Sequence, residues 1–167
     1  MPRHSKLTWS RPERPQLPDP AVVERLLGRP SFTRCTIAVT CPAGGPAVLD
    51  NAPADIHGRP FPTRYWLACR ALVDAVSRLE AAGGVRALEA DPAMAAHILA
   101  ANARHRQLHA GFNIGGTREP ARVKCLHAHL AFAMATGGSP IGDWIAVRTD
   151  LTWPATCCAE APGADGR

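Results

Sequence analysis

The order of apolar and polar residues predicts short strands in the first half of the chain. The segments CTIAVT at 35–40, PAVLD at 46–50 and FPTRYWLAC at 61–69 are rich in β-branched, aromatic and apolar residues, which favour extended backbone. The turn-forming run CPAGG separates the first two segments. We therefore expect a hairpin with Cys41 at its turn, followed by a third strand.

Helical spacing of apolar residues, bounded by prolines and glycines, predicts helices around these strands. Leu72, Val76 and Leu79 recur with the period of a helix that Gly83 ends. The predicted helices cover 19–27, 70–83, 91–109 and 120–137. The sequence thus predicts an α+β fold, a small antiparallel hairpin or three-stranded sheet covered by about four helices.

One domain with two tails is the expected organisation of the 167 residues. Residues 1–18 place four prolines among charged side chains, so we expect a disordered, basic, Pro-rich arm. Residues 19–149 carry the predicted elements and form the single globular domain. Residues 150–167 show no periodicity and end in small and polar residues, which predicts a loose C-terminal tail.

Composition and charge narrow the class of protein. With 46% hydrophobic and 20% charged residues the chain is expected to be globular, and part of its formal net charge of +5 lies in the arm. Basic arms can bind nucleic acid but are more often only solvated. The N-terminus lacks the apolar stretch of a secretion signal, and no apolar run approaches the roughly 18 residues that span a bilayer. We therefore expect a cytoplasmic protein, outside membranes, whose six cysteines stay reduced.

The segment ARVKCLHAHLAFAMATGG carries the candidate chemistry. On a helix, Cys125 and His129 lie one turn apart on the same face, while His127 is about 200° from Cys125. A thiolate and an imidazole at that spacing can bind one metal ion. Cys41 and Cys69, both where a strand gives way to a loop, are the other candidate ligands, although no CxxC pair supports them.

Two other interpretations of these cysteines remain open. Cysteines are among the most buried residue types, and these side chains can simply fill the core. Alternatively, Cys69 is a reactive thiol, because a helix N-terminus and Arg70 both favour its thiolate. His127 or His129 would then be the base of a cysteine-dependent enzyme. The residues do not decide whether the chain is an enzyme.

A further candidate is a binding site for phosphate or another anion. Gly115 and Gly116 precede the predicted helix start, and Arg122 and Lys124 lie in its early turns, with His127 on the face of Lys124. The alternative is a flexible loop with solvated charges. No GxxxxGK[ST], GxGxxG or HExxH motif occurs, so the sequence indicates no nucleotide-binding loop, dinucleotide fold or zinc protease.

Several segments together resemble a bacterial family catalogued as domain of unknown function 501. They are LGRP, CPAGGPAVLDNAP, GRPFPTRYWLAC, SRLEAAGGV, VKCLHAHLAF and GGSPIGDW, and they run in this order from Leu27 to Trp144. The family pattern has a CP-x-G turn, a TCP after the aromatic strand and a KCLH-x-H helix. The residues that fall on these motif positions are Cys41, Cys69, Cys125, His127 and His129.

The resemblance sharpens the candidate site and leaves the reaction open, because the family's function is unknown. It leads us to expect a Cys3His zinc site, structural or regulatory, formed by Cys41, Cys69, Cys125 and His129. If His129 stays off the metal, the three thiolates suit an iron–sulfur cluster or an exchangeable ligand. This chain departs from the family pattern at Arg70, where Pro is usual, and at Phe132, where many members have a further histidine.

Overall fold

Six α-helices and one three-stranded sheet make up residues 10–31 and 33–149, the part of the chain that the computed structural model describes. This arrangement confirms the predicted α+β fold. Residues 1–9 of the predicted arm and the whole predicted C-terminal tail, residues 150–167, lie outside the described residues. The elements are α1 Pro20–Leu27, β1 Thr33–Thr40, β2 Pro46–Asp55, β3 Tyr65–Leu67, α2 Arg70–Ala81, α3 Gly84–Ala90, α4 Ala95–Leu108, the 3-10 turn η1 Ile114–Gly116, α5 Leu126–Ala135 and α6 Pro140–Thr149.

The sheet has the order β1-β2-β3 with antiparallel neighbours. β1 and β2 form the predicted hairpin, and the short β3 pairs only with residues 48–50. Residues 10–18 of the predicted arm lie along the free edge of β1, where the N–H groups of Ile37 and Thr40 donate to the carbonyls of Gln16 and Ser10 at 2.8 and 2.9 Å. This part of the arm therefore covers a sheet edge.

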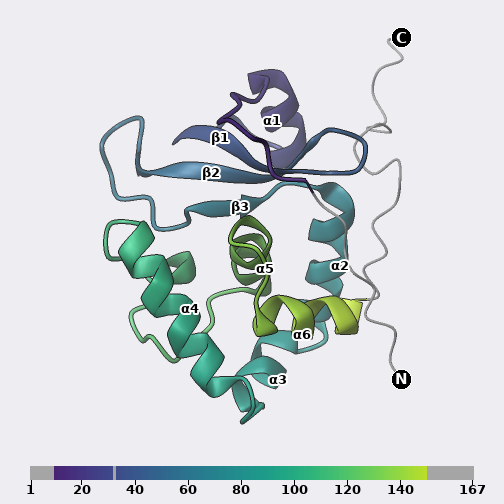
Figure 1. The fold of residues 1–167 in the computed structure, drawn as a ribbon, viewed down its shortest axis with the longest axis vertical. Coiled ribbons are helices and arrows are strands. Elements are labelled where there is room, and N and C mark those ends of the chain that lie inside the picture. The colour runs from purple at the N-terminus through teal and green to yellow at the C-terminus, as the bar shows by residue number, and fades with distance from the viewer. Residues whose placement is uncertain (1–9, 32, 150–167) are drawn as a thin grey trace.

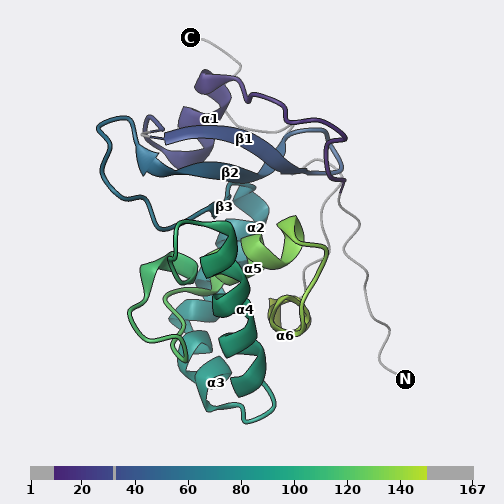
Figure 2. The same ribbon diagram turned by 60° about the vertical axis from the view of Figure 1, so that its left-hand side comes forward.

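Two hydrophobic clusters pack on the two faces of the sheet. α1 covers one face, where Val23 packs with Leu49 and Ala68. The other helices lie on the opposite side, and the larger cluster joins Val39 and Val48 of the sheet to α2, α4, α5 and α6. Figures 1 and 2 show this layering, with α1 above the sheet and α2 and α5 below it.

α5 is the central helix of the larger cluster. It contacts β3, α6, α2 and η1, and every residue of it except His127 is buried. A helix that is apolar on all sides is typical of such an enclosed position. His127 is therefore the one position at which α5 presents a polar side chain toward the surface.

The predicted helices differ from the observed ones mainly at their starts. The helix predicted from residue 120 begins only at Leu126, and the one predicted from Asp91 begins at Ala95, because Asp91 and Pro92 form a separate turn whose Met94 N–H bonds to the Asp91 carbonyl. α3 and α6 were not predicted. None of the helices in residues 10–31 and 33–149 combines the length and the apolar character needed to cross a membrane.

Candidate metal centre

The start of α5 is held against the turn between α2 and α3. Cys125 is the N-cap of α5, with extended backbone at φ −158° and ψ 153°. Leu126 follows, fully buried, and a Cβ built on Gly84 would lie only 2.9 Å from its Cδ1. This close approach, which only glycine allows, brings the last turn of α2 beside the N-terminus of α5. There the Glu80 carboxylate accepts a hydrogen bond from the Leu126 N–H.

Glu80, Cys125 and His127 form a group of metal-ligand type. A carboxylate oxygen, the thiol sulfur and a ring nitrogen of the three residues all lie within 4.8 Å of one another, and each side chain is partly buried. Within residues 10–31 and 33–149 this is the one such group of three or more His, Cys, Asp or Glu side chains. The arrangement joins one residue from α2 to two from the start of α5.

The hydrogen bonds of His127 fix how its ring presents to this group. Nε2 lies 3.2 Å from the Val73 carbonyl and 3.1 Å from the Ser77 hydroxyl. A carbonyl only accepts, so Nε2 carries the hydrogen and donates it. In the neutral ring Nδ1 then presents a lone pair to Glu80 Oε1, 3.2 Å away. Two acceptors that face each other at this distance are satisfied by a proton shared between them or by a metal ion bound to both.

The surroundings of the Cys125 thiol disfavour its thiolate form. Burial raises its pKa, and the nearby charge of Glu80 raises it further. The backbone N–H groups of Ala128 and His127 and the charge of Lys124 act in the opposite direction without reversing the shift. A cation bound beside the sulfur would supply the positive charge that stabilises a thiolate.

Three of the predicted zinc ligands lie outside this group. Cys41 is buried in the hairpin turn, where its sulfur accepts a hydrogen bond from the Gly45 N–H at 3.3 Å. Cys69 is the N-cap of α2 and fully buried, so its thiol has no access to a substrate in solution. Of the predicted set Cys41, Cys69, Cys125 and His129, only Cys125 belongs to the group of three.

The helical phase that paired Cys125 with His129 does not apply to Cys125. The count of 100° per residue holds only inside a helix, and Cys125 lies before it in extended backbone. His127, in the first turn, groups with the sulfur instead. The prediction that His129 is the more buried histidine is confirmed, since 1% of it is exposed against 24% of the His127 side chain. Neither ring nitrogen of His129 has a hydrogen-bond partner among the described residues.

The predicted anion-binding residues do not converge on a helix start. Gly115 and Gly116 lie in the η1 turn, where the stem of Lys124 packs over Gly115. Arg122 forms an ion pair with Glu89 at 3.1 Å, so its charge is already matched. The N-terminus of α5 begins later than predicted, and its first N–H already binds the carboxylate of Glu80.

Glu80 is the member of the group that the sequence did not reveal. It precedes Cys125 by 45 residues, and a carboxylate in the last turn of a helix is ordinarily a solvated surface charge. The available signal was its place in SRLEAAGGV, one of the segments shared with the family pattern.

Comparison with known proteins gives a family and nothing more specific. The model of one family, described as protein of unknown function (DUF501), matches residues 37–111 and 96–147. These ranges include Glu80, Cys125 and His127. No curated protein and no solved structure matches the chain.

Proposed function

The chain belongs to the DUF501 family, and because that family's function is unknown, we propose from the site geometry that it is a zinc-binding protein whose ion is held by Glu80, Cys125 and His127. Carboxylate, thiolate and imidazole are all ordinary zinc ligands. The proposed site has three protein ligands, whereas the site predicted from the sequence was a closed Cys3His site with four. Three ligands leave one position of a tetrahedral ion for water or substrate, the pattern of catalytic zinc.

The orientation of the His127 ring is the observation that carries the proposal. Zinc-bound histidines commonly donate their second ring N–H to a carbonyl, as Nε2 of His127 does to Val73. A nitrogen ligand and an oxygen ligand of the same tetrahedral zinc ion lie about 3.4 Å apart. The observed separation of Nδ1 and Glu80 Oε1 is 3.2 Å, so this pair needs almost no rearrangement.

The partial exposure of the site favours a reactive or exchangeable zinc over a purely structural one. All three side chains are partly buried, whereas a structural ion is usually enclosed by four protein ligands. A bound zinc ion lowers the pKa of a coordinated water and polarises a coordinated oxygen. Zinc-dependent chemistry on a small substrate, or reversible zinc binding, are the roles that this geometry supports.

Two of the alternatives from the sequence, an iron–sulfur cluster and a nucleophile at Cys69, have less support. An iron–sulfur cluster usually takes four cysteine thiolates, and the group supplies one. A nucleophile at Cys69 needs access to its substrate, and the Cys69 side chain is fully buried.

Cobalt substitution tests the proposal, because Co²⁺ bound by a thiolate gives a sulfur-to-metal charge-transfer band in the near ultraviolet. We expect metal-free protein to bind one equivalent of Co²⁺ with that band. Cys125→Ser abolishes the band, and Glu80→Gln and His127→Gln weaken binding. His97→Gln, at an exposed histidine of α4, is the matched control and leaves binding unchanged.

Three outcomes count against the proposal. They are the absence of a charge-transfer band, a band that persists in Cys125→Ser, and freshly purified protein with the visible absorption of an iron–sulfur cluster.

A further inference from the structure

The end of the β1–β2 hairpin that is remote from its turn faces the C-terminal end of α4. A cavity of about 410 Å³ opens there, within the range of roughly 300–1,000 Å³ that small-molecule sites occupy. Its walls come from residues 10–18, β1, β2 and the segment after α4. Glu80, Cys125 and His127 do not line it, so it is separate from the candidate metal centre.

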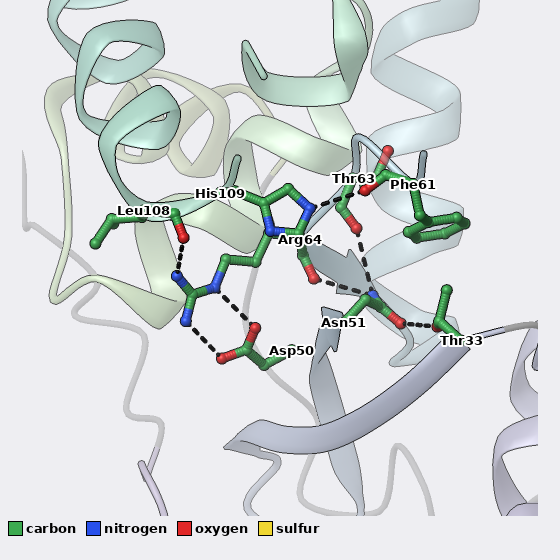
Figure 3. A network of polar contacts seen from close by, with 8 residues as sticks. All are labelled: Thr33, Asp50, Asn51, Phe61, Thr63, Arg64, Leu108 and His109. Atoms are coloured by element: carbon green, nitrogen blue, oxygen red, sulfur yellow. Dashed lines mark hydrogen bonds and ion pairs between the residues drawn. The ribbon is translucent and has the colours of Figure 1, made fainter. Parts of the chain in front are cut away.

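A partly buried arginine forms the centre of its polar wall. Arg64 donates from Nε and Nη2 to the two carboxylate oxygens of Asp50 at 2.8 and 3.1 Å, and from Nη1 to the Leu108 carbonyl at 2.6 Å. Figure 3 shows the guanidinium between Asp50 and the end of α4. Asp50 and Arg64 neutralise each other, and the pair holds the hairpin and the helix at a fixed separation.

Further buried hydrogen bonds fix the backbone behind this pair. The Asn51 side chain accepts from the Thr33 hydroxyl at 2.6 Å and donates to the Arg64 carbonyl at 2.9 Å. His109, 3% exposed, donates from Nε2 to the Phe61 carbonyl at 2.8 Å. Such connected side chains hold a cavity in one shape before any ligand enters.

Ala110 is held in an unfavourable conformation at the wall of the cavity. Its φ of 48° lies in the left-handed region, and it is the one non-glycine residue with positive φ among residues 10–31 and 33–149. A residue with a Cβ adopts this region only where its surroundings enforce it, and such residues cluster at binding sites.

The lining of the cavity has one positive charge in excess. Its described charged residues are Arg34, Arg64 and Asp50, and the last two neutralise each other. Arg34 is exposed and makes no hydrogen bond or ion pair with any described residue. An anion in the cavity would give this guanidinium its partner.

Two large apolar side chains stand exposed at the same cavity. Leu17 is 84% exposed and Leu108 is 42% exposed, and both line it together with Pro53. Exposed leucines beside an unmatched arginine form a surface that is complementary to a molecule with an apolar body and an acidic group.

We propose that this cavity binds a small organic anion, with its acidic group at Arg34 and its apolar body against Leu17 and Leu108. The acidic group is a carboxylate or a phosphate ester, since both form the paired hydrogen bonds that a guanidinium offers. Leu17 belongs to the segment that lies along β1, so the arm completes the site.

Titration of the full chain with 2-naphthoate and with 2-naphthyl phosphate, followed by amide NMR shifts, tests this proposal. We expect saturable shifts at residues 34–36, 50–53 and 108–110. Arg34→Glu weakens binding of both probes by at least about tenfold, and Leu17→Asp weakens it as well. The tighter of the two probes identifies the acidic group.

Two controls make the outcome decisive. Arg86→Glu reverses an exposed charge on α3 and is expected to leave both affinities unchanged. The cation 2-naphthylmethylamine has the same apolar body and is expected not to bind. Each of three results would overturn the proposal: neither anion binds, the cation binds as tightly as the anions, or Arg34→Glu leaves the affinities for both anions unchanged.

Discussion

At the start of α5, Glu80, Cys125 and His127 turn three electron-pair donors toward one another, whereas the cavity beside α4 is lined by an arginine without an acidic partner in the described chain. Both regions contain a histidine whose ring is fixed by a hydrogen bond to a backbone carbonyl. They differ in what lacks a partner: electron-pair donors in the first region and a positive charge in the second.

This difference indicates a different class of ligand for each region. A group of convergent acceptors is satisfied by a cation, and an unmatched guanidinium beside apolar walls is satisfied by an amphipathic anion. The two sites share no residue, so changes at one are expected to leave the other intact.

The largest expected effect is that of zinc on stability. Zinc that binds only the folded chain raises the free energy of unfolding by about 4 kcal/mol at a thousand times its dissociation constant. We expect thermal unfolding to shift upward with zinc and back with chelator in the natural protein and in Arg34→Glu. Cys125→Ser should show no zinc effect, and a full effect in that variant would break the comparison between the sites.

A smaller expected effect distinguishes His129 from His127, the ligand of the proposed metal site that lies two residues before it. Burial lowers the pKa of His129 to about 4, from an ordinary value of 6.5. The unfolded chain therefore binds more protons between these values, so stability is retained above pH 6.5 and lost as the pH falls toward 4, by about 3 kcal/mol.

Denaturant unfolding of metal-free protein at several pH values measures this loss. His129→Leu removes the buried imidazole and should flatten the profile while zinc binding persists. Part of the slope should remain, because burial also lowers the pKa values of His105 and His109. An unchanged slope in the variant would mean that His129 is not the titrating group.

The smallest expected effect concerns the polar wall of the cavity. Asp50→Asn leaves the partly buried guanidinium of Arg64 without its charged partner, which should lower the free energy of unfolding by about 1–2 kcal/mol. Binding of 2-naphthoate should tighten, because Arg64 becomes a second guanidinium without an acidic partner at the cavity, and zinc binding should not change. Asp74→Asn, an exposed aspartate of α2, is the control for both measurements. A loss of zinc binding in Asp50→Asn would show that the two sites are coupled.

The fold was predictable from the sequence where the signal is local. The β-branched runs and the CPAGG turn between them predicted the hairpin. The helical spacing of Leu72, Val76 and Leu79, ended by Gly83, predicted α2. α6 was missed although Ile141, Trp144 and Ile145 are buried at helical spacing. Gly142 obscured the pattern, and its reason is tertiary, since a Cβ there would lie 2.6 Å from the Ala133 Cβ of α5.

The site was less predictable, because its geometry depends on contacts between distant segments. Cys125 and His127 were singled out as chemistry-bearing residues, but the helical phase was counted through an N-cap that is extended. Glu80 comes from another helix, placed by the contact of Gly84 with Leu126. No spacing rule in a single sequence carries that information.

X-ray absorption at the zinc edge of protein loaded with one equivalent of zinc tests the central claim most directly, because it counts sulfur ligands. We predict one sulfur at about 2.3 Å, with the remaining ligands nitrogen or oxygen at about 2.0–2.2 Å. Three sulfurs would contradict the account and support the site of Cys41, Cys69, Cys125 and His129 instead. Failure of the protein to take up zinc would contradict it equally.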